Sequence, residues 1–329
     1  MSDLSFSFIV IGKNEGWKLS KCLDSINHAI EIAELKNTEL IYVDSKSSDD
    51  SVERALKKPG IRVFCVTGKC NAAIGRKIGG NEAKGDVLVF LDGDMELQSD
   101  FLPEVISLYS KGVRFISGQI IEYFYDENWK KIGERKVFAD HKLNKYDLTN
   151  GGAFVIAADQ WKLVNGMRTK YVRSEDIDIT YRLIQKGYYV FRSKELFVIH
   201  HTIQYDYNTT VINEISNFRN YLFRGLLIRD HLFNYKIIKR VIRINYTLLF
   251  LLFSTILSVV FSNFLFLLIY LVLIGLRSYL HYQKIKTVVN TGYLLSLFKY
   301  IFIDISGTIG IFFFFPKNIS VDYIEQKTE

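Results

Sequence analysis

Short apolar runs alternate with longer amphipathic stretches along the N-terminal third of the chain. The apolar runs have strand-like spacing and cover residues 6–11, 39–43, 62–66 and 87–91. The amphipathic stretches between them have helical spacing and cover residues 17–33, 51–58 and 71–83. Strands and helices in this alternation are typical of a mainly parallel sheet with helices on both faces. The pattern therefore predicts an α/β domain whose ligands bind at the carboxyl ends of the strands.

The alternation changes after Asn150. Gly151-Gly152 leads into an apolar run at 153–157, and a helix is expected to begin at Ser174. Two further apolar runs, at 188–192 and 196–199, are predicted to be the closing strands of the sheet. We therefore assign residues 1–208 to the first domain.

The C-terminal third has a different pattern. Residues 209–243 are rich in aromatic residues and arginines and are predicted to form connecting helices. From Lys236 onwards basic and apolar residues are mixed, as in a helix that lies on a membrane surface and is attracted by anionic lipid heads. Residues 244–276 contain no charged side chain. We expect a transmembrane region over residues 244–316 and a tail at 317–329.

The number of membrane spans is open between two and three. Residues 244–276 exceed the roughly 20 residues that one span needs, and Ser262-Asn263 interrupts them. One long tilted helix is possible, but a hairpin would return Arg277 to the starting side, which the positive-inside bias favours. The segments would then be about 244–261, 264–280 and 293–315. The last contains Lys299 and Asp304, so it either spans the membrane or lies partly in the interface.

Composition agrees with a membrane-bound chain made in the cytoplasm. Hydrophobic residues are 49% and aromatic residues 15% of the 329 residues, and the formal net charge is +7. Its three cysteines have no metal-type spacing and are expected to be free thiols in a reducing compartment. The first apolar run has no basic segment before it, unlike a signal peptide. We therefore expect a multi-pass protein of the inner cell membrane with a cytoplasmic first domain.

Asp92-Gly-Asp94 follows an apolar strand directly. Two carboxylates separated by a glycine can both face one site, because glycine permits a sharp turn. Hard oxygen ligands suit Mg²⁺ or Mn²⁺, which complete their coordination with phosphate oxygens and water. Asp-Gly-Asp is also a common turn sequence, so it is the position after a strand that favours a metal site.

Other polar residues fall at predicted strand ends. Glu15 follows the first strand, and Asp44 ends the second, where a carboxylate can bind a nucleoside; a helix cap is its alternative role. The loop 68–76 precedes a helix and contains Arg76, which suits phosphate, although a solvated basic face is the plainer interpretation of its lysines.

Three further groups have both a structural and a catalytic interpretation. Glu175 and Asp176 follow Ser174 at a helix start, which is ordinary capping chemistry, but Asp176 is also a candidate general base. His200 is either a structural histidine or a ligand that completes the Asp94 metal site. Arg219 and Arg224 either snorkel at the membrane surface or bind a diphosphate.

Together these segments resemble the family 2 glycosyltransferases, inverting enzymes with the Rossmann-like GT-A fold. The matching segments are FIVIGKNEG, IYVDSKSSDDS, GRKIGGNEAKGDVLVFLDGDMEL and NGGAFVIAADQWKLVNGMRTKYVRSEDIDITYRLIQKGYYV. They extend over about residues 5–201, so the match is far more specific than any single motif.

The resemblance implies a role for each matching position. Asp44 would bind the nucleoside, Asp92 and Asp94 the sugar nucleotide and Mn²⁺ or Mg²⁺, and Asp176, beside Glu175, would be the base. His200 would be a metal ligand. The family commonly has Arg-Asn where this chain has Arg76-Lys77. It usually has two aspartates and a glycine where this chain has Asp44-Ser45-Lys46, and this second departure leaves the identity of the nucleotide base open.

The same resemblance implies a hexosyltransferase of surface polysaccharide or glycoconjugate synthesis. The processive members carry Gln-x-x-Arg-Trp after the acidic pair, and no tryptophan follows Glu175 here, which argues against processive synthesis. The C-terminal part resembles bacterial exopolysaccharide and capsule transferases. The expected partners are a UDP-sugar, a polyprenyl-diphosphate-linked acceptor and membrane lipids, with no nucleic acid and with homo-oligomerisation open. The alternatives are a polyprenyl-phosphate sugar synthase and a non-catalytic membrane subunit that retains the fold.

Overall fold

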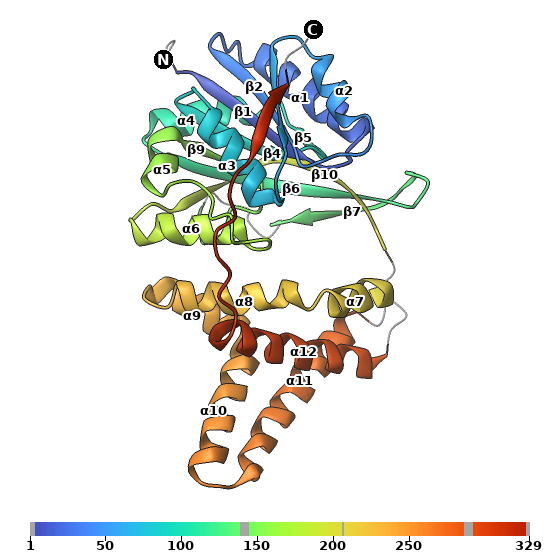
Figure 1. Cartoon of the computed structure of the whole chain (residues 1–329), viewed down its shortest axis with the longest axis vertical. Helices are drawn as coiled ribbons and strands as arrows, with labels where there is room; N and C mark the ends of the chain where they lie inside the picture. The colour runs from blue at the N-terminus through green and yellow to red at the C-terminus, as the bar shows by residue number, and fades with distance from the viewer. Residues whose placement is uncertain (1–3, 139–144, 206, 286–291, 327–329) are drawn as a thin grey trace. The chain divides into compact units, whose positions relative to one another are not determined.

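The computed structural model describes residues 4–138, 145–205, 207–285 and 292–326 (Figure 1). The chain divides into two compact units, one formed by residues 1–204 with 317–329 and the other by residues 205–316. Each unit is described separately below.

The first unit is built on an eleven-stranded mixed sheet in the order β11-β3-β2-β1-β4-β9-β6-β10-β5, with β7 beside β6 and β8 beside β10. The strands are β1 (Phe6–Gly12), β2 (Thr38–Asp44), β3 (Ile61–Val66), β4 (Val87–Asp92), β5 (Met95–Leu97), β6 (Phe115–Tyr125), β7 (Lys131–Val137), β8 (Lys145–Asp147), β9 (Phe154–Ala157), β10 (Val190–Ile203) and β11 (Tyr323–Gln326). Strands β3, β2, β1 and β4 are parallel to one another, whereas β9 is antiparallel to β4. This arrangement confirms the predicted α/β class, but the sheet is mixed and not mainly parallel, because the strands outside the β3-β2-β1-β4 group and the β6–β10 pair are joined by antiparallel pairings.

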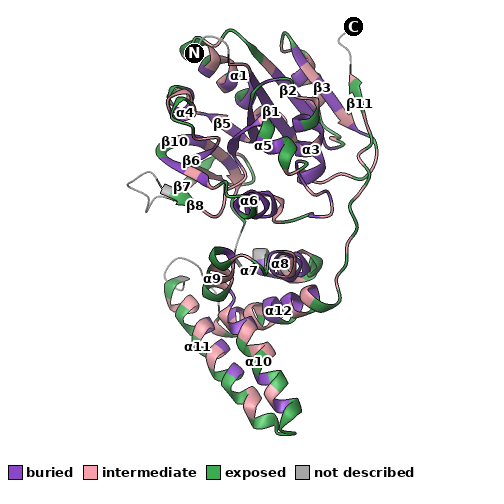
Figure 2. Cartoon of the chain, turned by 90° about the vertical axis from the view of Figure 1, so that its left-hand side faces the viewer, coloured by how far each residue is buried: buried purple, intermediate pink, exposed green. Residues whose placement is uncertain are grey.

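Helices cover both faces of this sheet, because its central strands are apolar on both sides (Figure 2). On β1, Phe8 and Val10 belong to one core, and Ile9 and Ile11 belong to the other. The first core includes residues from α1 (Trp17–Ile32), α2 (Ser51–Leu56) and α4 (Phe101–Ser110). The second includes residues from α3 (Ala72–Glu82), α5 (Ala158–Leu163) and α6 (Glu175–Gln185).

Helix α3 lies unusually close to β1, and this position matters for the site. A Cβ atom added at Gly79 would lie 2.3 Å from Ile9 Cγ2, so only a glycine permits this approach. The N-terminus of α3 is capped by Asn71, whose side chain accepts a hydrogen bond from Ile74 N at 2.8 Å. The helix therefore starts at a fixed point beside the strand ends.

The second unit is helical. It contains α7 (Tyr207–Ser216), α8 (Arg219–Asp230), α9 (Tyr235–Ile244), α10 (Tyr246–Val260), the short 3₁₀ helix η1 (Phe264–Phe266), α11 (Leu267–Ile285) and α12 (Tyr293–Phe312). Two helices, Phe264–Lys284 and Tyr293–Phe312, are long and apolar enough to cross a membrane, and the pair α9–α10, bent by 87°, could provide a third span.

The uncharged stretch 244–276 is not one continuous helix. Helix α10 ends at Val260, and the chain turns through residues 261–263 into η1 and α11. Arg277, in the middle of α11, donates hydrogen bonds to Thr247 Oγ1 and, at 3.2 Å, to Ile244 O, which brings this part of α11 beside the start of α10. The two helices form a hairpin, the arrangement that the positive-inside bias favours.

The predicted tail at 317–329 takes part in the first unit. Strand β11 pairs antiparallel with β3, from Tyr323 opposite Val66 to Gln326 opposite Val63 (Figure 1, dark red). The sequence signal was too short to predict this strand, because it has only four residues and two of them are polar.

Candidate active site

A cavity of about 350 Å³ opens where the parallel strands end. It is lined by Ile11, Gly12, Lys13, Glu15, Ser45, Cys70, Asn71, Ala72, Asp92 and Asp94. The register explains the clustering, since Gly12 is opposite Asp44 on β2 and Ile11 is opposite Asp92 on β4. The cavity thus lies at the carboxyl edge of the sheet, where the sequence pattern predicts a ligand site.

Arg76 joins the two acidic segments of the site. It is 2% exposed, its Nη2 donates to Asp92 Oδ1 at 2.6 Å, and its Nη1 donates to Glu175 Oε1 at 2.8 Å. Nη2 also lies 3.2 Å from the carbonyl oxygen of Gly152, at the start of the segment that leads into β9. One guanidinium therefore holds together α3, β4 and the start of α6, and a catalytic role of Glu175 stays a prediction.

Asp92 is partly exposed towards the cavity, and its surroundings change its pKa. Burial raises the pKa of this carboxyl, Arg76 opposes the change and Asp94 adds to it, and the result is about 6. Such a perturbed carboxyl in a cavity is typical of functional sites.

Asp94 and His200 meet at the other side of the motif. His200 Nε2 lies 3.2 Å from Asp94 Oδ2, and its Nδ1 lies 3.9 Å from Glu122 Oε1. Burial alone would lower the pKa of His200, but its hydrogen bonds to Asp94 and Glu122 raise it to about 10. Lys18 lies 3.8 Å from Asp94 Oδ2 and 2.6 Å from Glu15 Oε2. These charges partly neutralise one another.

The donor atoms at Asp94 and His200 fit a divalent cation. Asp94 Oδ1 is buried, and it has no hydrogen-bond partner among the described residues, so one hard oxygen ligand is left for a cation. Within the described part of the chain, no group of three or more His, Cys, Asp and Glu side chains is arranged to hold a metal by itself. A cation at this position would therefore need further ligands from a substrate phosphate or from water, as is usual for Mg²⁺.

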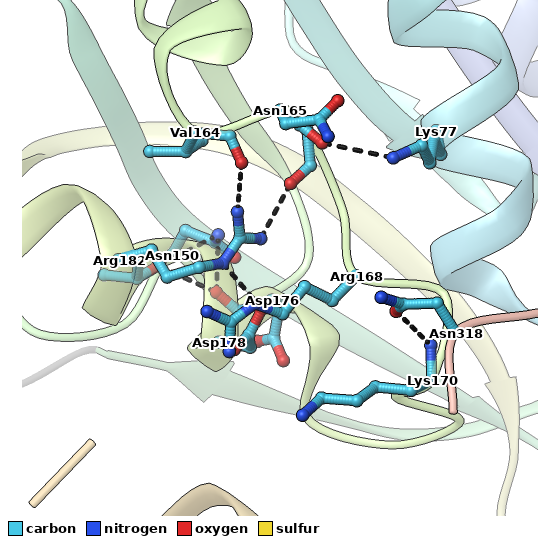
Figure 3. Close-up of polar contacts among 12 residues, drawn as sticks. Lys77, Asn150, Val164, Asn165, Arg168, Lys170, Asp176, Asp178, Arg182 and Asn318 are labelled. Atoms are coloured by element: carbon cyan, nitrogen blue, oxygen red, sulfur yellow. Dashed lines mark hydrogen bonds and ion pairs between the residues drawn. The ribbon is translucent and has the colours of Figure 1, made fainter. Parts of the chain in front are cut away.

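Hydrogen bonds to the backbone carbonyl of Asp176, and not a helix cap, fix the position of this residue. Asn150 Nδ2 donates to Asp176 O at 3.1 Å and to Thr180 Oγ1 at 3.2 Å, and Thr180 Oγ1 donates to Asp176 O at 2.8 Å (Figure 3). Ser174 occupies the N-cap position in a left-handed conformation, with φ of 65°, and its side chain makes no capping bond. The structural interpretation predicted a capping bond from the Ser174 side chain, and the structure does not contain this bond.

The electrostatic surroundings of Asp176 oppose the effect of its helix. A helix N-terminus favours the ionised form of a carboxylate in the first turn. Instead burial, followed by the charge of Glu175, raises the pKa of Asp176 to about 6, although Arg76 and backbone hydrogen bonds oppose the change. Such a pKa lies close to the working range of a general base.

Asp44 has a structural role that the sequence did not reveal. It is 3% exposed, and its carboxylate accepts hydrogen bonds from Tyr42 Oη at 3.0 Å and Ser47 N at 2.9 Å. Its neighbour Ser45, and not Asp44, lines the cavity. Asp44 therefore braces the turn after β2, and its predicted contact with a nucleoside stays a prediction.

The remaining predicted residues lie in two places. Glu15 lines the cavity, and burial, followed by the charge of Asp94, raises its pKa. Arg219 and Arg224 lie on α8 of the second unit, and their binding to a diphosphate also stays a prediction.

Several site residues had no readable signal in the sequence. Glu122 faces His200 because the two are paired neighbours on β6 and β10, a pairing between strands far apart in the chain. Asn150 binds the carbonyl oxygen of Asp176 through its side-chain amide, and Gly152 accepts a hydrogen bond from Arg76 through its own carbonyl oxygen. Among these residues, Lys18 could have been inferred from the sequence, because it follows Glu15 by three positions at a helix start.

Comparisons with known proteins show which sequences this chain is similar to. Residues 7–161 match the family model described as "Glycosyl transferase family 2". The chain is 26% identical over 144 residues to "Polypeptide N-acetylgalactosaminyltransferase 3" of Drosophila melanogaster, covering 42% of this chain and 21% of that protein. It is 28% identical over 148 residues to "Dolichol-phosphate mannosyltransferase" of Saccharomyces cerevisiae, covering 42% of this chain and 51% of that protein. The chain thus matches about a fifth and about half of the length of these two curated relatives.

Proposed function

We propose that this chain, whose residues 7–161 match the glycosyl transferase family 2 model, transfers one sugar from a nucleotide-diphosphate sugar to a lipid-linked saccharide. The donor is proposed to be a UDP-sugar, and the anomeric configuration is inverted. The observation that carries the proposal is the position of Arg76 between Asp92 and Glu175 at the edge of the strand-end cavity.

The proposed chemistry is a single displacement. The acceptor hydroxyl oxygen forms a bond to the anomeric carbon while the bond from that carbon to the diphosphate oxygen breaks. Asp176 takes the hydroxyl proton, and the nucleoside diphosphate leaves with the electron pair of the broken bond. Arg76 keeps Asp92 and Glu175 in place, so that Asp92 can orient the donor sugar and ribose.

A divalent cation is proposed as the cofactor. Asp94 and His200 would hold it, with Asp92 beside them, and the cation would be Mn²⁺ or Mg²⁺. When bound, it supplies positive charge that stabilises the leaving diphosphate. Asp94 Oδ1, which is buried and has no hydrogen-bond partner in the described part of the chain, supports this assignment.

The acceptor is proposed to be a saccharide linked to a polyprenyl diphosphate, as in surface polysaccharide or glycoconjugate synthesis. The support is the second unit, whose apolar helices α11 and α12 suit a membrane and whose helix α9 is basic. A lipid-linked acceptor is presented at the membrane surface, where such a unit would keep the enzyme. We propose the inner cell membrane as the location, with the catalytic unit in the cytoplasm.

A second candidate function is supported by the similarity to a dolichol-phosphate mannosyltransferase. In a polyprenyl-phosphate sugar synthase the acceptor is a phosphate that is already ionised, so the reaction needs no base. Sugar transfer that is unaffected by the substitution Asp176→Asn would favour this alternative.

The test is transfer by the full chain in lipid nanodiscs, with UDP-sugars offered one at a time and polyprenyl-diphosphate saccharide as the acceptor, with and without Mn²⁺. We expect one donor to be used and the Asp94→Ala variant to be inactive. The matched control is Asp100→Asn, which removes the charge of an exposed aspartate that makes no capping bond. Equal turnover by Asp94→Ala and the intact protein would contradict the metal assignment, and absence of donor binding in calorimetry would favour a non-catalytic subunit.

A further inference from the structure

The first unit is completed by residues on both sides of the second unit in the chain. Residues 1–204 and 317–329 form one compact body, with residues 205–316 inserted between them. In a membrane protein this arrangement limits the number of times that the chain can cross the membrane between residues 204 and 317.

The return of the chain into the first unit is firmly anchored. Besides the ladder between β11 and β3, Thr67 N donates to Asp322 O at 2.8 Å. Arg62 Nε donates to Glu325 Oε1 at 3.0 Å, and the Tyr323 hydroxyl donates to Glu82 Oε1 at 2.6 Å. Thr169 Oγ1 donates to Ile319 O and accepts from Ile319 N, both at 2.8 Å. Residues 319–325 are therefore part of the folded catalytic unit and not a loose tail.

A folded catalytic unit lies on one side of a membrane. The chain leaves this unit after residue 204 and is back in it by residue 319, so it must cross the membrane an even number of times. Helix composition allows two or three spans, and the return of the chain excludes three.

The hairpin α10–α11 has the properties of the element that enters lipid. Residues 244–276 carry no charge, and many apolar side chains of the hairpin are exposed, among them Phe253, Val259, Phe264 and Val272, at 54–81% (Figure 2). At the turn Asn263 accepts from Leu265 N at 2.9 Å, so part of the backbone there is satisfied locally. Helix α10 has 15 residues and α11 has 19, which gives about 22 and 28 Å against roughly 30 Å for the hydrocarbon core, and Arg277 lies near the middle of α11.

Helix α12 is also long and apolar enough to cross a membrane, but it packs against the charged helix α8. It packs against α8 so closely that a Cβ at Gly225 would lie 2.0 Å from Gly307 O. Arg229 on α8 donates to Ile311 O at 3.0 Å. Within twelve residues α8 carries Arg219, Arg224, Arg229 and Asp230, and burying such a helix in hydrocarbon is very costly. Because α12 lies along α8, it belongs to the interface.

We infer that the hairpin α10–α11 crosses the bilayer twice and that α12 does not cross it. The apolar surface of the hairpin is then an interaction surface for lipid chains, and the basic helix α9, bent by 87° from α10, faces the lipid heads. Gly292 and Lys317, at the two ends of α12, lie on the same side of the membrane as the catalytic unit. This inference rests on the proposed membrane attachment and not on the proposed chemistry.

The test is cysteine labelling of the full chain in cells with a membrane-impermeant maleimide. Cys65 and Cys70 are replaced by Ser, whereas Cys22 is buried and is kept. Single cysteines are then placed by Ser262→Cys at the hairpin turn, Gly292→Cys before α12 and Lys317→Cys after it. Lys317→Cys reports the side on which the catalytic unit lies.

We expect Gly292→Cys and Lys317→Cys to be labelled together, from one side, and Ser262→Cys to be labelled from the other. Opposite labelling of Gly292→Cys and Lys317→Cys would show that α12 crosses and would overturn the inference. Labelling of all three from one side would overturn the two crossings, and so would release of the protein from membranes by alkaline carbonate. Sugar transfer is not measured here, so a failure of the proposed chemistry leaves these outcomes unchanged.

Discussion

Arg76 Nη2 lies 2.6 Å from Asp92 Oδ1, on a guanidinium that is 2% exposed and that also binds Glu175. A buried charge of this kind is stable only while its partners remain. The first aspartate of the Asp92-Gly-Asp94 motif is therefore positioned by a residue sixteen places earlier in the chain, and the geometry of the motif depends on helix α3.

Replacing Arg76 tests this dependence. We expect Arg76→Lys to lower kcat by about 100-fold, because an ammonium group cannot bridge two carboxylates as a planar guanidinium does. Removal of one partner from a buried ion pair costs about 3 kcal/mol, so Arg76→Ala should also lower the melting temperature. The matched control is Lys77→Ala, since Lys77 makes its hydrogen bond to Asn165 O away from the cavity. Normal turnover by Arg76→Lys would contradict the bridging role.

The pH dependence of sugar transfer tests Asp176. Its pKa is raised to about 6 by burial and by Glu175, and a general base must be ionised to accept a proton. Activity should therefore be lost as the pH falls through about 6 and should be fully present above pH 7. We expect Asp176→Asn to lower kcat by ~10²- to 10⁴-fold. The pKa of Asp92 is raised similarly, so an acid limb that persists unchanged in the residual activity of Asp176→Asn would assign the limb to Asp92 instead.

Metal binding can be measured without turnover. We expect Mn²⁺ in the presence of UDP to bind the intact protein and to give an electron paramagnetic resonance signal distinct from that of free Mn²⁺. His200→Ala should weaken this binding by ~10-fold or more, because an imidazole ligand is lost. His28→Ala is the control, since His28 lies on α1, outside the cavity lining. Equal affinity of the His200→Ala and intact proteins would remove His200 from the metal site.

The hydroxyl of Tyr323 tests how strongly β11 supports the first unit. Tyr323→Phe removes its hydrogen bond to Glu82, a charged acceptor, which should cost about 1.5 kcal/mol. Trp17, Trp129 and Trp161 all lie in the first unit, so tryptophan fluorescence reports its unfolding selectively. Ile324→Val, at a half-exposed position of the same strand, is the control. An unchanged melting temperature for Tyr323→Phe would mean that the ladder to β3 alone holds the strand.

The central strands and the acidic motif could be predicted from the sequence because both signals are local. An apolar run such as Val87–Leu91 with aspartates directly after it identifies a strand and a site residue together. Contacts between distant segments could not be predicted. The pairing of Glu122 with His200 depends on the β6–β10 register, and the bond of Arg76 to Glu175 joins two helices that are far apart in the chain.

The β11 strand also affects the order in which the protein is completed during synthesis. It is made after the helices of the second unit, yet it occupies an edge of the sheet of the first unit, next to β3. While the ribosome is still making the hairpin, the exposed edge of β3 has open hydrogen-bonding groups and can pair with other strands. The sheet of the first unit therefore reaches its final form only after the helices of the second unit have been synthesised, because the strand that covers β3 follows them in the chain.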